Sequence, residues 1–187
     1  MLAGIGRRTP ITRRVMFFID GGYLRESLKQ ITGDENFALY NFPEYFTRQF
    51  FPSIYNPELI RTYYYDAIYD VDNPLYKERK DYFDALNSYE NVEVKLGSLV
   101  KTTDGYRQKG VDILMANDVL TKAYQDHYDC AILFCGDRDI LPLVQVVKDA
   151  AGKKVYGIVF DGHYSKELRN EFDKCIVITD KNLQYLR

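Results

Sequence analysis

Tryptophan is absent from the sequence, and histidine and cysteine are scarce, which limits the metal sites that the chain can build. There are two histidines, both isolated, and three cysteines (Cys130, Cys135 and Cys175) with no CxxC pair among them. A structural zinc site needs four such ligands at short spacings, so the sequence argues against one. The odd number of cysteines indicates reduced, buried thiols rather than a disulfide framework.

Long apolar runs and a strong net charge are also missing. No run approaches the roughly 20 apolar residues of a membrane span, and the basic stretch 1–14 lacks the apolar core of a secretory signal. We therefore expect no membrane association and a cytoplasmic location. The net charge of −2 argues against a surface that is positive throughout, although it leaves a local basic patch open.

The residues that are present suffice for one domain with a substantial core. The 187 residues are 46% hydrophobic and 28% charged, as in ordinary globular proteins. Residues 1–14 carry four arginines and no regular pattern, so we expect a flexible basic arm there. A single domain is expected over residues 15–187, because no composition shift or repeat marks a boundary.

Short apolar runs alternate with segments of helical periodicity along the chain. The apolar runs predict strands at 15–20, 60–69, 92–100, 130–135, 153–160 and 175–178. The periodic segments predict helices at 23–31, 43–51, 74–89, 111–127, 140–152 and 165–172. Residues 102–110 are polar and predict a loop, and Gly21 and Gly22 predict a turn after the first strand. The alternation is typical of an α/β fold, and we expect a Rossmann-like three-layer sandwich, with a mostly parallel central sheet and helices on both faces.

Acidic residues follow two of the predicted strands. Asp20 ends the first strand, and Asp137 and Asp139 come just after the fourth. Ligands of open α/β sheets bind beyond the carboxyl ends of the strands. If the first and fourth strands are neighbours, these three carboxylates converge at one edge of the sheet.

A fourth acid, Asp112, lies in the first turn of the predicted helix 111–127. The apolar residues three, four, seven and eleven positions later are Met115, Ala116, Val119 and Ala123. At helical spacing they share a stripe with Asp112, so we expect Asp112 on the core-facing side. By the same geometry Asp118 is expected on the solvent side.

Four carboxylates at one edge would repel one another unless a cation lies between them. A pair about 4 Å apart costs roughly 4 kcal/mol at an effective dielectric constant of about 20. An all-oxygen site suits Mg²⁺ or Mn²⁺, which can activate water and stabilise charge on a phosphate. Each acid alone also has a structural interpretation, as a turn residue, a helix cap or a favourable charge in a first helical turn. We assign only structural roles to Asp66, Asp118 and Asp161.

Three motifs resemble the NYN domain family, in its LabA-like branch, within the PIN-like nuclease superfamily. They are "FIDGGYL" (18–24), "KGVDILMANDVL" (109–120) and "LFCGDRDILPLVQVVKDAAGKKV" (133–155), and the resemblance spans about residues 15–180. It implies a PIN-like fold and a ribonuclease in which Asp20, Asp112, Asp137 and Asp139 bind Mg²⁺ or Mn²⁺ and cleave RNA.

The chain departs from the family pattern at three positions. Cys135 replaces the usual serine and Ile140 a common phenylalanine, which are changes of packing. Tyr23 stands where many members have asparagine, which changes the polar contacts near the metal.

The leading hypothesis is a metal-dependent ribonuclease that prefers single-stranded RNA to duplex DNA. Arg107, Lys109 and Arg138 are placed to contact phosphate oxygens, unless they are simply solvated surface charges. Tyr23 and Tyr106 lie beside the proposed metal ligands, where unpaired bases could stack, although packing roles explain them equally well.

Two other classes of function remain open. The chain could be a non-catalytic PIN-like module that binds RNA or a protein partner. A TOPRIM-like phosphotransfer domain is more remote, because that fold has a glutamate where this chain has Asp20. A dinucleotide-dependent dehydrogenase is excluded, since no GxGxxG follows the first strand. The sequence leaves the oligomeric state open, a homo-oligomer included.

Overall fold

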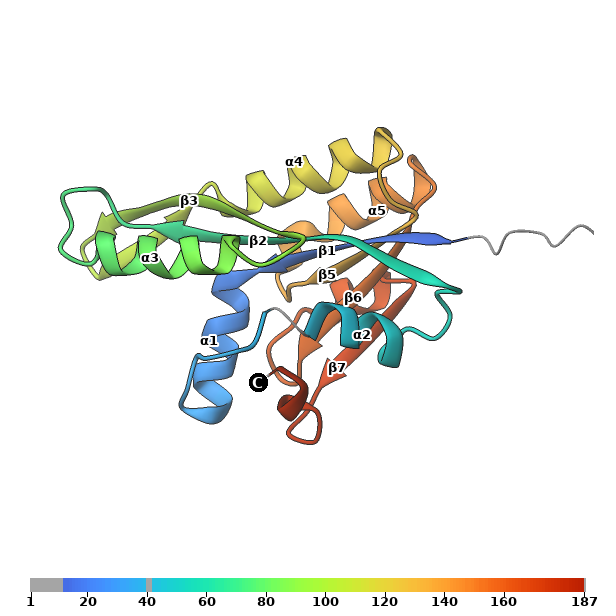
Figure 1. The fold of residues 1–187 in the computed structure, drawn as a ribbon, viewed down its shortest axis with the longest axis horizontal. Helices are drawn as coiled ribbons and strands as arrows, with labels where there is room; N and C mark the ends of the chain where they lie inside the picture. Colours follow the sequence, from blue (N-terminus) through green and yellow to red (C-terminus); the bar gives the residue numbers. More distant parts are fainter. Residues whose placement is uncertain (1–11, 40–41, 187) are drawn as a thin grey trace, which may run out of the picture.

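The computed structural model describes residues 12–39 and 42–186, and within them the chain forms one seven-stranded sheet (Figure 1). Its strands are β1 (Arg13–Asp20), β2 (Pro57–Ile68), β3 (Val92–Thr102), β4 (Gly105–Lys109), β5 (Cys130–Phe134), β6 (Lys154–Phe160) and β7 (Lys174–Ile178). Their order across the sheet is β4-β3-β2-β1-β5-β6-β7, with β4 antiparallel to β3 and all other neighbours parallel. The mostly parallel sheet of an α/β fold is therefore confirmed.

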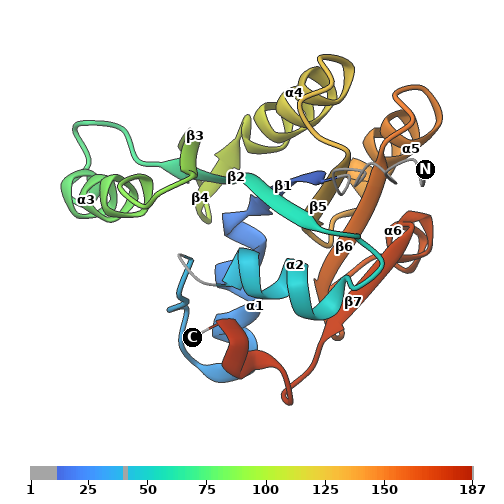
Figure 2. The ribbon, with the colours of Figure 1, turned by 45° about the vertical axis from the view of Figure 1, so that its right-hand side comes forward.

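Helices cover both faces of the sheet, which curls so that β6 and β7 turn away from β2 (Figure 2). The helices on one face are α1 (Gly21–Thr32), α2 (Phe42–Phe50) and α3 (Tyr76–Asn87). Those on the other are α4 (Val111–Tyr124), α5 (Leu141–Asp149) and α6 (Lys166–Glu171). Two 3₁₀ turns complete the description, η1 (Arg138–Ile140) and η2 (Leu183–Leu186). No helix among the described residues has the length and apolarity needed to cross a membrane.

Residues 15–19 of the central strand β1 are all apolar because both faces of the strand are covered. Val15, Phe17 and Ile19 pack in the core beneath α1 and α2, whereas Met16 and Phe18 pack in the core beneath α4 and α5. All five side chains are buried. A parallel strand covered on both faces needs apolar side chains on both, so alternation with polar residues disappears.

The expectation of a loop over residues 102–110 is wrong. Residues 105–109 form β4, which pairs antiparallel with β3 through a tight turn before Gly105. Gly105 has φ +132°, which side-chain-bearing residues rarely adopt. The strand lacked an apolar signature because it lies at the sheet edge with mostly exposed side chains. Its sequence signal is the Asp104–Gly105 pair, a hairpin dipeptide.

Two boundaries near the N-terminus also differ from the sequence-based expectation. β1 begins at Arg13, so the last two residues of the expected arm belong to the sheet, and Arg14 makes a 2.8 Å ion pair with Asp129. The rest of that arm, residues 1–11, lies outside the described residues. Gly21 and Gly22 do not form a separate turn, because they are the first two residues of α1.

Candidate active site

Asp20 lies where β1 passes directly into α1. It is the last residue of the strand and the N-cap of the helix, and its Oδ1 accepts a 2.9 Å hydrogen bond from a backbone N–H three residues on. A Cβ on Gly21 would lie 2.3 Å from the Tyr64 ring. A Cβ on Gly22 would lie 2.5 Å from the side chain of Gln108. The two glycines therefore let β2 and β4 approach the helical turn that follows this acid.

Asp137 occupies the corresponding place after β5, which pairs in parallel with β1. It caps η1, and its Oδ1 accepts a 3.0 Å hydrogen bond from the N–H of Asp139. Gly136 before it leaves no space for a side chain, since a Cβ would lie 2.4 Å from the carbonyl oxygen of His163. Because β1 and β5 are neighbours, Asp20 and Asp137 lie at the same edge of the sheet.

Asp112 joins this edge from the first turn of α4. Its side chain is exposed, yet its pKa is raised, by partial burial first and then by the charges of Asp137 and Asp139. The charge of Asp112 in turn acts on Asp20. The structure thus brings Asp20, Asp112, Asp137 and Asp139 into one electrostatically coupled group of carboxylates, which we call the acidic edge.

The predicted faces of α4 are wrong for both of its acids. Its buried residues are Val111, Met115, Asp118, Val119 and Ala123, and Asp112 is exposed beside them. The helix begins at Val111, as predicted. Val111, and not Asp112, is the first residue of the buried stripe. The buried stripe is therefore turned by one position, which brings Asp118 inward.

The buried carboxylate of Asp118 is fully partnered. It accepts hydrogen bonds from the Tyr65 hydroxyl at 2.9 Å and from Lys122 at 2.8 Å, and it forms a 3.2 Å ion pair with Lys95. Burial alone would raise its pKa, but these three donors outweigh burial and lower it. Asp118 therefore has the structural role that we expected of it, but in a buried rather than a solvated place.

Asp20 has the opposite electrostatic surroundings. Its pKa is raised to about 7, chiefly by burial, against the hydrogen bond from the Tyr23 N–H, and further by the charges of Asp112, Asp66 and Glu26. Nothing in the described part of the chain pairs any member of the acidic edge with a lysine, arginine or histidine. Over residues 12–39 and 42–186, the acidic edge is therefore a set of carboxylates with no counter-charge from the chain.

The donor set suits a hard cation. All four side chains offer carboxylate oxygens, and Asp20 and Asp137 each use Oδ1 for a backbone N–H and keep Oδ2 for another ligand. However, over residues 12–39 and 42–186 no three His, Cys, Asp or Glu side chains are grouped closely enough to hold a metal ion. The chemistry of the acidic edge fits Mg²⁺ or Mn²⁺, and its exposed side chains would have to move to surround one.

Asp66, near the end of β2, has a structural role, as the sequence analysis expected. It is completely buried, and it forms ion pairs with Arg25 of α1 at 2.9 Å and Arg79 of α3 at 3.4 Å. It stands one residue beyond the register partner of Asp20 on the neighbouring strand. The sequence did not reveal how close it lies to Asp20, whose pKa its charge helps to raise.

Glu26 is an acid close to Asp20 that the sequence did not single out. It is exposed on α1, and its charge contributes to the raised pKa of Asp20. No spacing in the sequence would have identified it, because its proximity depends on how α1 leaves the sheet.

Tyr23 proves to be a packing residue. Its hydroxyl accepts a 2.8 Å hydrogen bond from the N–H of Phe160, and its ring packs against Phe134 and Phe160 at centroid distances of 6.2 and 5.9 Å. A Cβ on Gly136 would lie 2.6 Å from this ring. These contacts are incompatible with the expectation that Tyr23 offers an open face to a base.

The three cationic residues expected to contact phosphate are all exposed. Arg107 and Lys109 lie on β4, on the opposite face from Tyr106 and Gln108, because side chains alternate along a strand. Arg138 lies in η1, between two members of the acidic edge. All three remain free to meet a polyanion.

Comparison with known proteins gives a family and a fold. The model of the NYN domain family matches residues 14–179. A crystal structure of a protein of unknown function from Vibrio parahaemolyticus superimposes with a TM-score of 0.64 and 18% sequence identity, covering 90% of this chain and 94% of that one. No curated protein matches the chain.

Proposed function

The chain belongs to the NYN domain family, a PIN-like nuclease family, and on that premise we propose that it is a ribonuclease that hydrolyses RNA phosphodiester bonds at the acidic edge. The observation that carries the proposal is the contrast among its acids. Asp66 and Asp118 have cationic partners from the protein, whereas the acidic edge has none in the part of the chain that the structure describes. The three motifs further favour the LabA-like branch.

We assign Asp20, Asp112, Asp137 and Asp139 as the ligands of Mg²⁺ or Mn²⁺. When bound, such an ion polarises a phosphate and lowers the pKa of an attacking water. Asp20 and Asp137 each accept a hydrogen bond from a backbone N–H, which fixes the direction of the carboxylate. These two side chains therefore form the more rigid part of the site. Asp112 and Asp139 are exposed and supply the adjustable part.

Substrate binding would use the cations around this edge. Arg138 can meet the phosphate between two acids, and Arg107 and Lys109 can meet the strand as it runs along β4. The slightly acidic chain lacks the broad positive surface that favours duplex binding, so single-stranded RNA is the expected substrate. Replacing Lys109 with alanine should weaken binding and reduce its salt dependence by about one phosphate contact.

The test is a cleavage assay with labelled single-stranded RNA and duplex DNA, each with Mg²⁺ or Mn²⁺ and with EDTA. Asp137→Asn is the informative variant, and Asp161→Asn is its matched control, because Asp161 is an exposed acid that follows β6 at the same sheet edge. We expect metal-dependent cleavage of RNA that Asp137→Asn removes and Asp161→Asn retains. Equal cleavage of both nucleic acids would reject the substrate preference, and metal-independent cleavage would reject the mechanism.

A second candidate function follows from the absence of a formed metal group among the described residues. The chain would then bind RNA through the same surface without cleaving it. The same assay separates the two candidates, because this one predicts retained RNA binding and no cleavage by the unaltered protein with any divalent cation.

A further inference from the structure

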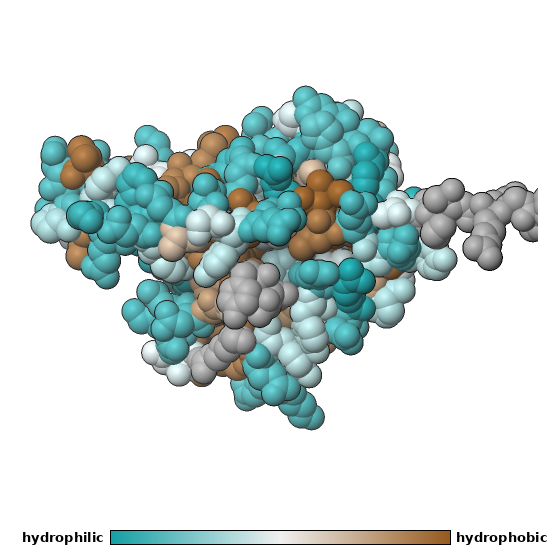
Figure 3. Space-filling view, viewed as in Figure 1, coloured by the Kyte–Doolittle hydropathy of each residue, from teal (hydrophilic) through white to brown (hydrophobic). Residues whose placement is uncertain are grey.

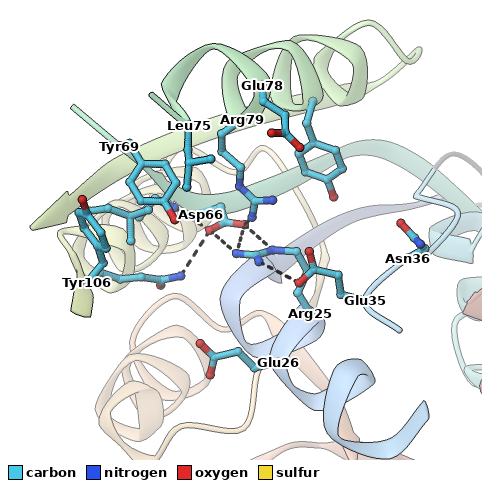
Figure 4. A pocket seen from close by; sticks show the side chains of 14 residues that line it. Arg25, Glu26, Glu35, Asn36, Asp66, Tyr69, Leu75, Glu78, Arg79 and Tyr106 are labelled. Atoms are coloured by element: carbon cyan, nitrogen blue, oxygen red, sulfur yellow. Dashed lines mark hydrogen bonds and ion pairs between the residues drawn. The ribbon is translucent and has the colours of Figure 1, made fainter. Parts of the chain in front are cut away.

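A cavity of about 520 Å³ opens beside the acidic edge, on the face of the sheet that α1 and α3 cover (Figure 4). Side chains from α1, β2, α3, β3 and β4 line it. One of them, Gln108, contacts Gly22 in the helical turn that follows Asp20. The cavity therefore adjoins the place where the proposed function puts the scissile phosphate.

The floor of the cavity is held rigid by Asp66. Its carboxylate accepts two hydrogen bonds from Arg25, at 3.0 and 2.9 Å, one from Arg79 at 3.4 Å and one from the side-chain amide of Gln108 at 3.3 Å. Because Gln108 donates through Nε2, its Oε1 is left as an acceptor. The dashed lines of Figure 4 show these side chains converging from three elements on one buried acid.

The charges in the wall do not suit a phosphate. Four carboxylates (Glu26, Glu35, Asp66 and Glu78) face two guanidinium groups, those of Arg25 and Arg79. Both guanidinium groups pair with Asp66, and Arg25 also lies 3.6 Å from Glu35. What the wall offers to a ligand is mainly hydrogen-bond acceptors, which suit a group that carries N–H donors and no negative charge.

The rim offers a flat surface for stacking. Tyr106 is 46% exposed, its ring meets Tyr69 edge-to-face at 4.9 Å, and its hydroxyl accepts a 2.7 Å hydrogen bond from Asn73. Leu75 beside it is 50% exposed. Figure 3 shows apolar residues reaching the surface at this end of the molecule, where β2, α3 and β3 lie. The aromatic ring at the mouth of the cavity suits the π surface of a nucleobase, and the acceptors of the wall suit its N–H edge.

We propose that this cavity holds an unpaired base of the RNA strand next to the scissile phosphate, with a preference for bases that carry an amino group over uracil. The identification of the strand as RNA rests on the proposed function. Tyr106 stacks on the base, and Gln108 and Glu78 accept hydrogen bonds from its N–H groups. Cleavage would then depend on the identity of the base held beside the acidic edge.

The test measures binding without turnover, with short fluorescent oligomers of adenosine and of uridine in EDTA. We expect the unaltered protein to bind the adenosine oligomer more tightly. Tyr106→Ala should weaken that binding about fivefold or more, which corresponds to about 1 kcal/mol, whereas Tyr106→Phe should retain it. Glu78→Gln should reduce the preference for adenosine. Tyr124→Ala is the control, because Tyr124 is a similarly exposed tyrosine on α4, over the other face of the sheet.

Equal binding by the unaltered protein and Tyr106→Ala would overturn the inference, as would no preference between the oligomers or no RNA binding at all. Free adenosine binding as tightly as the oligomer would also overturn it, because the cavity would then be a nucleoside site. If Tyr106 governs binding but the protein cleaves no RNA with Mg²⁺ or Mn²⁺, the inference stands and the ribonuclease proposal fails.

Discussion

Asp20 ends β1, and Asp66 lies two residues before the end of the neighbouring strand β2, yet the fold surrounds the two acids differently. Asp66 is completely buried, with Arg25 and Arg79 as cationic partners. Asp20 has one hydrogen bond from a backbone N–H, three acids nearby and a pKa of about 7. A buried carboxylate that serves only the fold is expected to be paired. One left without a counter-charge indicates a site that a ligand completes.

The same contrast recurs on α4. Asp118 is buried among Tyr65, Lys95 and Lys122, whereas Asp112 is exposed and its pKa is raised by partial burial and by the charges of Asp137 and Asp139. Each paired acid thus has an unpaired counterpart on the same edge or helix. Removing the charge of one acid at a time, by Asp→Asn substitution, shows whether stability or activity depends on it.

The largest effect is expected at Asp112. Asp112→Asn should lower RNA cleavage roughly 100-fold or more, because a ligand of the catalytic ion is lost, while the free energy of unfolding stays the same within about 0.5 kcal/mol. Single-turnover cleavage and urea denaturation measure the two quantities. Asp118→Asn is the reciprocal control, since it should change stability and leave most of the activity. Equal losses of activity in both variants, with no difference in stability, would contradict the assignment of a catalytic role to Asp112 and a structural role to Asp118.

The next largest effect concerns the free energy of unfolding at Asp66. Asp66→Asn removes the buried charge partner of two guanidinium groups, of which Arg25 keeps its 3.6 Å pair with Glu35. It should lower stability by about 2–3 kcal/mol, somewhat less than for a fully buried pair because both arginines are partly exposed. Asp84→Asn is the control, because its pair with Lys80 lies on the surface, where solvent screens it, and should contribute little to stability. Equal midpoints of urea denaturation for the two variants would contradict this expectation.

Asp20→Asn should act in the opposite direction. Folding raises the pKa of Asp20 from 3.8 to about 7, so ionisation opposes the folded state increasingly as the pH rises from about 4 to about 7. Asparagine keeps the N-cap and removes the charge, and the metal-free variant should be about 1–2 kcal/mol more stable at pH 8. The gain should vanish at pH 4. Thermal unfolding at the two pH values, in EDTA, tests this, and a gain that is independent of pH would assign it to packing instead.

The smallest effect is the pH dependence at Asp118. Folding lowers the pKa of this acid, so its stabilising contribution is present above the ordinary aspartate pKa and is lost as the pH falls through the folded value. Asp118→Asn should therefore cost about 1 kcal/mol at pH 7 and clearly less in acid, below the ordinary aspartate pKa. Urea denaturation at pH 7 and in acid measures the difference. An equal cost under both conditions would show that the hydrogen bonds to Asp118 stabilise the fold without its charge.

The central strands and their acids could be predicted because buried parallel strands carry an unambiguous apolar signal. β1 and β5 lie where the sequence places them, and so do the acids that follow them. β4 could not be found in this way, since an edge strand needs no apolar side chains. The predicted start of α4 at residue 111 agrees with the structure, but the exchange of Asp112 and Asp118 shows that apolar periodicity locates the buried face of a helix only to within about one position. The partners of Asp66 come from three separate elements, and no local pattern reports them.

The central claim is that the unpaired acids hold a divalent cation, and NMR with isotope-labelled protein and substoichiometric Mn²⁺ tests it most directly. If the acidic edge binds Mn²⁺, amide signals of Gly21, Asp112 and Gly136 broaden first, and Asp20→Asn removes this effect. Signals near Glu58, an exposed acid at the start of β2 and therefore at the opposite edge of the sheet, provide the internal control. Broadening that is weak everywhere, or that is as strong at Glu58 and unchanged in the Asp20→Asn variant, would contradict a metal site at the acidic edge.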